Sequence, residues 1–95
     1  MSNFKQKTFR SRKYLDWVKT LPCRNCGAVF EIDPHHLTSL GLMGGAGTKA
    51  PDTMVMPLCR TCHTDMHDKG DYRQYQWEWI ARTLNQAIND GVLKI

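Results

Sequence analysis

Side chains that bind metal ions are concentrated in two parts of this chain of 95 residues. The segment 59–67 reads Cys-Arg-Thr-Cys-His-Thr-Asp-Met-His, so a Cys-x2-Cys pair runs directly into two histidines. His63 and His67 are four residues apart, and on a helix they would lie on one face and could reach a single ion. A doublet, His35 and His36, lies upstream. These residue types favour metal-assisted hydrolysis over a purely structural role.

The four cysteines form two Cys-x2-Cys pairs, Cys23 with Cys26 and Cys59 with Cys62. Four thiolates are the tetrahedral ligand set that Zn²⁺ prefers, and a structural zinc would stabilise the small core of so short a chain. An iron–sulfur centre uses the same ligands. Cys-Arg-Thr-Cys-His also fits the pattern of covalent haem attachment. Haem attachment would leave the first pair without a role, and we predict a structural zinc.

All four histidines of the chain belong to the doublet or to the segment after the second cysteine pair. His63, His67 and one member of the doublet would make a three-ligand site with open positions, which a catalytic ion needs. The other member could accept a proton from water, because the ordinary pKa of imidazole lies near neutrality. Imidazole ligands tolerate several metals, so Mg²⁺, Mn²⁺, Ni²⁺ and Zn²⁺ are all candidates for this divalent ion.

The length predicts a single domain over residues 1–95, with residues 1–9 as a flexible basic tail. A first helix is predicted from about Phe9 to Leu21, with Ser11 as a cap near its start. Pro22 ends this helix. Its apolar stripe at helical spacing consists of Tyr14, Trp17, Val18 and Leu21.

Two strands and two helices should follow. Residues 28–32 are prone to form a strand that can run on through 36–37, and residues 53–56 are the second strand of a hairpin around the glycine-rich loop 38–51. A short helix over 60–69 should end at Gly70, and a C-terminal helix should lie within 71–90, from about Tyr72 to Asn89. The predicted fold class is therefore α+β. The predicted apolar face of the C-terminal helix is Trp77, Ile80, Ala81, Leu84 and Ile88.

The net charge of +4 is unevenly distributed along the chain. The first 24 residues hold seven basic side chains and one acidic one, whereas the remainder holds six basic and eight acidic ones. Such an excess at one end is typical of a protein that binds a polyanion, and also of a solvated tail that improves solubility. No apolar run reaches membrane length and no secretory signal is recognisable, so we expect no membrane association and a cytoplasmic location, where thiols stay reduced.

Three segments in combination resemble the HNH endonucleases, the nucleases with a ββα-metal finger. They are Asp33-Pro-His-His36, the segment 52–63 that ends in Pro-Leu-Cys-Arg-Thr-Cys-His, and His67. The chain is most similar to small phage and prophage nucleases of the Ref type, which share the histidine doublet, the glycine-rich loop ending in Lys-x-x-Asp, and the Pro-Leu-Cys-x-x-Cys-His ending. The resemblance covers residues 23–69 and implies a zinc-stapled finger that hydrolyses DNA phosphodiesters.

The resemblance also implies roles for single residues. His36 resembles the general base that activates water, and His35 resembles a ligand of the catalytic ion together with His63 and His67. The residues themselves leave open which member of the doublet is the base. One ion would bind the scissile phosphate and stabilise the leaving oxygen.

Three further residues are candidates near this site. Asp52 stands nearest to the Asn with which the family braces the loop carrying the base, and an ionised Asp accepts hydrogen bonds but cannot donate them. Lys49 and Arg60 are candidate contacts to DNA phosphates. The resemblance further implies a recombinase filament as a partner and the cytoplasm of a bacterial host as the location. Cutting both DNA strands would need two copies of the chain.

Two non-enzymatic functions compete with this hypothesis. A zinc module that binds nucleic acid would keep the cysteines and the basic end and leave the histidines without a role. A protein-interaction adaptor would use the aromatic residues of the C-terminal helix, namely Tyr72, Tyr75, Trp77 and Trp79.

Overall fold

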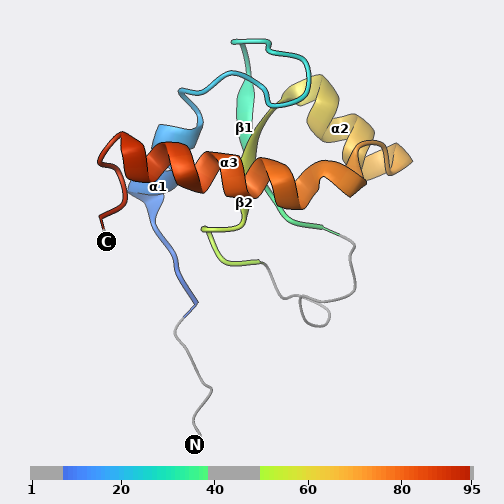
Figure 1. The fold of residues 1–95 in the computed structure, drawn as a ribbon. Helices are drawn as coiled ribbons and strands as arrows, with labels where there is room; N and C mark the ends of the chain where they lie inside the picture. Colours follow the sequence, from blue (N-terminus) through green and yellow to red (C-terminus); the bar gives the residue numbers. More distant parts are fainter. Residues whose placement is uncertain (1–7, 39–49, 95) are drawn as a thin grey trace, which may run out of the picture.

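A computed structural model describes residues 8–38 and 50–94 of the chain. The fold of these residues is small α+β, with two antiparallel strands and three α-helices around them (Figure 1). Residues 1–7 of the predicted basic tail lie outside the described residues. Lys49, a predicted contact to DNA phosphates, lies outside them as well. None of the helices in the described ranges combines the length and the apolar character that a membrane span requires. In chain order the elements are α1 (Arg12–Val18), β1 (Ile32–His36), β2 (Val55–Cys59), α2 (Arg60–Lys69), the 3-10 turn η1 (Arg73–Tyr75) and α3 (Gln76–Asn89).

The two strands form a hairpin whose register places Pro34 opposite Pro57. Proline has no N–H to donate, so this pair fits only where the ladder needs no donor from either residue. The carbonyl of Pro57 accepts a hydrogen bond from the backbone N–H of Arg24 at 2.9 Å. The first cysteine pair is therefore tied to β2 through Arg24, one of the two residues between its cysteines.

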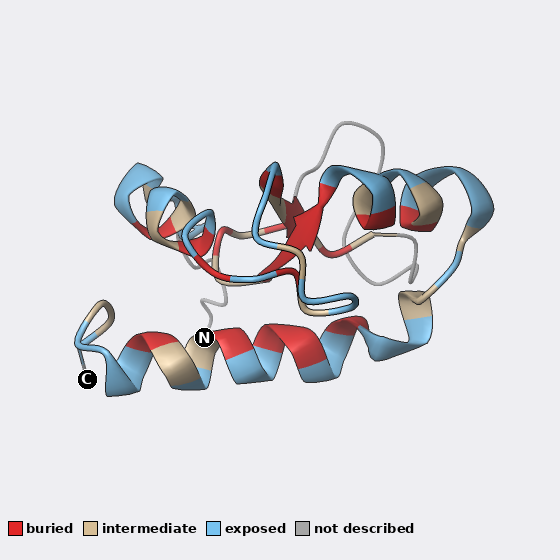
Figure 2. Ribbon diagram, turned by 90° about the horizontal axis from the view of Figure 1, so that it is seen from above, coloured by how far each residue is buried: buried red, intermediate tan, exposed pale blue. Residues whose placement is uncertain are grey.

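Strand β2 is buried along its whole length, because it contacts β1 and all three α-helices. The main core cluster includes Met56 and Leu58 of β2 with Trp79 and Ile80 of α3. A second cluster joins Val55 to Tyr14 and Val18 of α1 and to Ala87 of α3. Figure 2 shows α3 along one side of the molecule with its buried face turned toward the other elements.

Helix α2 and the cap of α1 agree with the sequence prediction. Helix α2 covers Arg60–Lys69 and ends at Gly70, whose φ of 76° is the left-handed conformation that glycine adopts readily. Ser11 caps α1 by accepting a hydrogen bond from the N–H of Tyr14 at 3.1 Å. Helix α1 itself is shorter than predicted, because the chain turns after Val18 and Leu21 enters the core from outside the helix.

Both strands begin later in the chain than predicted. Val29 and Phe30 are 65% and 76% exposed, and Glu31 has a φ of 52°, so the chain enters β1 only at Ile32. The second strand starts at Val55 and runs through Pro57 to Cys59, since the proline occupies a position that needs no donor.

The C-terminal helix begins later than predicted, and its buried face is a different one. Tyr72 has a φ of 67°, and η1 separates it from α3. Trp77, Ala81 and Ile88 are exposed, and Leu84 is half-buried. The predicted face was wrong except for Ile80 and the half-buried Leu84, because the two polar residues at the centre of the buried face carry no hydrophobic signal. The buried face consists of Gln76, Trp79, Ile80, Thr83 and Ala87.

Candidate functional site

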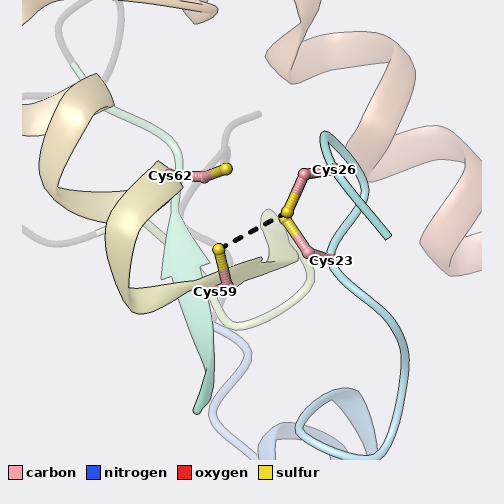
Figure 3. A group of neighbouring side chains, drawn as sticks. All are labelled: Cys23, Cys26, Cys59 and Cys62. Atoms are coloured by element: carbon pink, nitrogen blue, oxygen red, sulfur yellow. Dashed lines mark hydrogen bonds between the residues drawn. The ribbon is translucent and has the colours of Figure 1, made fainter. Parts of the chain in front are cut away.

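The four cysteines converge from three parts of the chain, as Figure 3 shows. Cys23 and Cys26 lie in the turn after α1, Cys59 is the last residue of β2, and Cys62 lies in the first turn of α2. The four sulfur atoms all lie within 4.8 Å of one another. Among the described residues they are the one group of three or more side chains whose ligand atoms are gathered this closely.

The spacing of the sulfurs fits a tetrahedral metal ion. Cys26 Sγ and Cys59 Sγ are 3.7 Å apart. Zn–S bonds of about 2.3 Å place the corners of a tetrahedron about 3.8 Å apart. None of the four cysteines is in a disulfide. The donor set therefore suits a structural zinc. The sequence prediction that the four cysteines form one cluster is confirmed.

The local structure holds the first cysteine pair in a tight turn. The N–H of Gly27 donates to the carbonyl of Cys23 at 3.0 Å, and Gly27 has a φ of 81° that other residues rarely adopt. Arg24 points the other way and donates to Thr83 and Gln86 of α3, at 3.3 and 2.9 Å. The turn is thereby fixed to α3 as well as to β2.

Burial and backbone amides act in opposite directions on the cysteine thiols. Burial raises the pKa of Cys23. Hydrogen bonds from the backbone N–H groups of Cys26 and Cys59 and from other nearby donors together have the larger, opposite effect and lower the pKa to about 7. Burial is the main cause that raises the pKa of Cys62, to about 12. Four thiolates this close together need a cation to be stable, so metal binding would displace the remaining protons.

Three imidazoles gather next to this cluster, at the interface of β1 and α2. The ring centroid of His35 lies 4.4 Å from that of His63 and 5.7 Å from that of His67. The centroids of His63 and His67 are 5.6 Å apart. The structure thus brings together the three residues predicted to be ligands of the catalytic ion. Their nitrogens lie further apart than the cysteine sulfurs do, so the rings would have to turn to share an ion.

His35 is the most buried member of this histidine trio, with 2% of its surface exposed. Its Nε2 atom is buried, and no described residue forms a hydrogen bond with it. Burial, followed by the charges that His63 and His67 can carry, lowers the pKa of His35 to about 3. His35 is therefore a neutral imidazole at physiological pH, with a buried nitrogen that has no partner among the described residues.

Asp33 orients His63 from the strand. Its Oδ2 lies 3.1 Å from His63 Nδ1, and its two oxygens accept hydrogen bonds from Arg60 at 3.3 Å each. Burial raises the pKa of Asp33, but the hydrogen bonds from Arg60 and His63 outweigh it and leave the pKa below its ordinary value. The carboxylate is thus ionised and holds the proton of His63 on Nδ1, which leaves Nε2 free to bind a metal ion.

An open hollow of about 280 Å³ lies over two of the three imidazoles. Its lining residues come mainly from the exposed side of α2. A phosphate entering this hollow would meet the guanidinium of Arg60 and the rings of His63 and His67. The full lining is Asp33, Arg60, His63, Thr64, His67 and Asp68.

His36 has a different partner from the other histidines. Its Nε2 lies 2.8 Å from Asp52 Oδ1, and Asp52 is 4% exposed. Burial raises the pKa of Asp52, but the hydrogen bonds from His36, from the N–H of Ser11 and from Arg10 lower it below its ordinary value. An ionised Asp52 holds the proton of His36 on Nε2, which leaves Nδ1 as a proton acceptor.

The predicted site residues thus fall into three groups. The cysteines form one cluster, and His35, His63 and His67 form a second one beside Asp33 and Arg60. His36 and Asp52 form a pair, and within the described residues no ring contact joins His36 to the trio. The predicted phosphate contact of Lys49 lies outside the described residues.

Sequence reasoning missed Asp33, Arg10 and Ser11 as residues of these sites. A signal for Asp33 was present, because it is two residues before His35 and strand residues at that spacing point to the same side. Arg10 and Ser11 carried no such signal, since they contact Asp52 across more than 40 residues of chain.

Comparisons with known proteins identify a family but no activity. The chain is 43% identical over 93 residues to an uncharacterized protein, YdfU, of Escherichia coli strain K12, a match that covers 94% of this chain and 26% of YdfU. The chain thus spans about a quarter of the length of that curated relative. No solved structure matches it significantly. The model of the family described as "Protein of unknown function (DUF968)" matches residues 1–91, and the chain belongs to this family.

Proposed function

We propose that this protein is a metal-dependent endonuclease that hydrolyses DNA phosphodiester bonds through a ββα-metal finger of the HNH type. The finger would consist of β1, β2 and α2, with the cysteines holding a structural zinc. His35, His63 and His67 would hold a divalent catalytic ion, and His36 would be the general base.

One observation carries this proposal. Nε2 of His35 is buried without a hydrogen-bond partner among the described residues, and it lies beside two imidazoles that line an open hollow. A buried polar atom without a partner is unfavourable by about 1–3 kcal/mol, and a metal ion would satisfy it. Asp33 supports the same conclusion, because metal-binding histidines almost always donate their other ring N–H to a carboxylate or carbonyl.

The residues divide the chemistry between them. A divalent ion, when bound, supplies the positive charge that holds the scissile phosphate and stabilises the leaving oxygen. Nδ1 of His36 accepts a proton from water as the water oxygen forms a bond to phosphorus. Asp52 stabilises the imidazolium that results, across the 2.8 Å contact to Nε2. The phosphorus–oxygen bond to the leaving group then breaks, and that oxygen takes a proton from solvent.

His36 is adjacent to a member of the trio in the chain, which supports this division of roles. It follows His35 at the last residue of β1, and its charge is among the causes that lower the pKa of His35. The role of ligand suits His35, which is buried, and the role of base suits His36, which is partly exposed and paired with a carboxylate.

The basic N-terminal third and Arg60 would contact the DNA backbone. A recombinase filament, a second copy of the chain and a cytoplasmic setting in a bacterial host are further parts of the proposal. The four free thiols support that setting, because zinc-binding cysteines must stay reduced.

Nicking of supercoiled plasmid tests the proposal directly. The wild-type chain should convert the plasmid to open circles with Mg²⁺, Mn²⁺ or Ni²⁺, and a chelator of the exchangeable ion should stop the reaction. His36→Ala should lower the rate by about 10²–10⁴-fold, the usual contribution of a general base. Added imidazole should restore part of the activity of this variant, because imidazole replaces the missing base.

The outcomes distinguish the nuclease from the non-catalytic alternative. Equal rates for the wild-type chain and His36→Ala, with the same metal content, would exclude the assigned base. DNA binding that weakens steeply with salt, without cleavage by any of the three ions, would favour a zinc module that only binds nucleic acid.

A further inference from the structure

Three hydrogen bonds join the N-terminal segment Phe9–Ser11 to Asp52. The N–H of Asp52 donates to the carbonyl of Phe9 at 2.9 Å, and the N–H of Ser11 donates to Asp52 Oδ2 at 2.8 Å. Arg10 Nη1 donates to Asp52 Oδ1 at 3.2 Å. The same Arg10 nitrogen also donates to the carbonyl of Ala50 at 2.7 Å. Residues 9–11 therefore form hydrogen bonds with both neighbours of Pro51, Ala50 and Asp52, and hold residues 50–52 in place.

These bonds fix both oxygens of the carboxylate that contacts His36. Oδ2 is taken by a backbone N–H, which cannot rotate away, and Oδ1 is shared between Arg10 and His36 Nε2. A carboxylate held at both oxygens has one orientation, and it therefore fixes the ring of His36 in one tautomer and one direction. The Arg10 guanidinium also helps to keep Asp52 ionised, as the lowered pKa of Asp52 reflects.

We propose that residues 9–11 form a strap that positions His36 through Asp52, and that Arg10 is a positioning residue for the reaction. The consequence for the reaction rests on the proposed function, whereas the consequence for His36 does not. Arg10 donates to Asp52 and to the carbonyl of Ala50, and neither residue is a proposed metal ligand. Its loss should therefore change the rate of the chemical step and leave the metal content unchanged.

Kinetics of the 95-residue chain test the first consequence. Arg10→Ala should lower kcat about ten- to hundredfold, because a small misplacement of a catalytic group has an effect of this size. Arg12→Ala is the matched control, since Arg12 is exposed, lies two residues further on and carries the same charge. Arg12→Ala shows how much KM changes when the chain loses one positive charge near the proposed DNA-binding surface. Arg10→Lys should recover most of kcat, because lysine keeps the charge and can donate to both acceptors.

The exchange rate of the His36 Nε2 proton tests the strap even if the protein cleaves no DNA. In nitrogen-15 NMR spectra of the zinc-loaded chain, this proton should be observable and protected in the wild type and in Arg12→Ala. In Arg10→Ala it should exchange at least about tenfold faster, as the orientation of Asp52 is lost.

The two measurements separate the two ideas. Absence of cleavage with a fast-exchanging proton in Arg10→Ala would refute the nuclease and keep the strap. Active enzyme in which Arg10→Ala matches Arg12→Ala in both kcat and proton exchange would refute the strap and keep the nuclease.

Discussion

Replacing Asp52 by Asn keeps the size of the side chain and reverses one hydrogen bond. In the wild type, Oδ1 faces His36 Nε2 and Arg10, and Oδ2 faces the N–H of Ser11. The amide has one oxygen and one NH2 group, so it cannot accept hydrogen bonds at both positions. If the oxygen faces His36, the NH2 group faces the Ser11 donor. If the oxygen faces Ser11, the NH2 group donates to His36 and the ring proton moves to Nδ1.

The second orientation should prevail by about 1–2 kcal/mol. Leaving the Ser11 N–H opposite another donor costs about 2–3 kcal/mol, the upper part of the usual range, because the two donors also repel each other. Losing the bond from the half-exposed Arg10 offsets about 1 kcal/mol of this. At about 1.4 kcal/mol for each factor of ten, the productive tautomer becomes roughly five- to thirtyfold rarer. A protonated Nδ1 cannot accept a proton from water, so kcat should fall by at least this factor.

The assay is plasmid nicking under single-turnover conditions, with the zinc content and the midpoint of urea unfolding measured on the same samples. Asp52→Asn should reduce the rate at least about fivefold and by no more than His36→Ala does. Its zinc content should equal that of the wild type. A wild-type rate for Asp52→Asn would refute the assignment of His36 as a base held by Asp52.

Three other predictions concern stability. Gln76→Ala should lower the free energy of unfolding by about 2–4 kcal/mol, because Gln76 is buried and forms hydrogen bonds with both the N–H and the carbonyl of Thr38, at 3.0 Å each. Urea unfolding checks this, with the exposed Gln74→Ala as a control that should stay within about 0.5 kcal/mol of the wild type. With zinc bound and no second ion, the wild type should lose stability relative to His35→Gln as pH falls from 6.5 to 5.5, by about 1 kcal/mol for each pH unit. The sign follows because the pKa of His35 is lowered to about 3 in the folded chain, so the unfolded chain takes up the proton first as pH falls. If urea unfolding gave the same stability difference between the two proteins at pH 6.5 and 5.5, the prediction would be contradicted. Cys62→Ser should destabilise the zinc-loaded chain by about 3 kcal/mol or more, because it removes one ligand of the cluster. The control is Thr61→Ala, which changes an exposed residue and should not destabilise the chain. Thermal unfolding of both variants, followed by circular dichroism, measures the difference.

The sequence predicted those features that depend on local spacing. Helix α2 was predicted with its observed bounds, because Gly70 is a recognisable signal for the end of a helix. The cysteine cluster follows from two Cys-x2-Cys pairs, which have few alternatives. The approach of His63 and His67 follows from their spacing of four residues on that helix.

Features that depend on contacts between distant parts of the chain could not be predicted in this way. The buried face of α3 is centred on Gln76 and Thr83, whose burial depends on partners elsewhere: Gln76 bonds the backbone of Thr38, and Thr83 accepts from Arg24. The second strand continues through Pro57 because the register places another proline opposite it. The pairing of His36 with Asp52 was outside the reach of spacing arguments, since 16 residues separate the two.

Metal counting tests the central claim, that three imidazoles bind an ion separate from the zinc of the cysteines. Elemental analysis and calorimetric titration with Ni²⁺ would be made on the wild type and on His63→Ala. We predict that the wild type keeps one zinc in the presence of a mild chelator and binds one further, exchangeable ion. His63→Ala should keep the zinc and lose the exchangeable ion. A wild type with one tight zinc and no second ion, or a His63→Ala variant that binds Ni²⁺ as the wild type does, would contradict the proposed site.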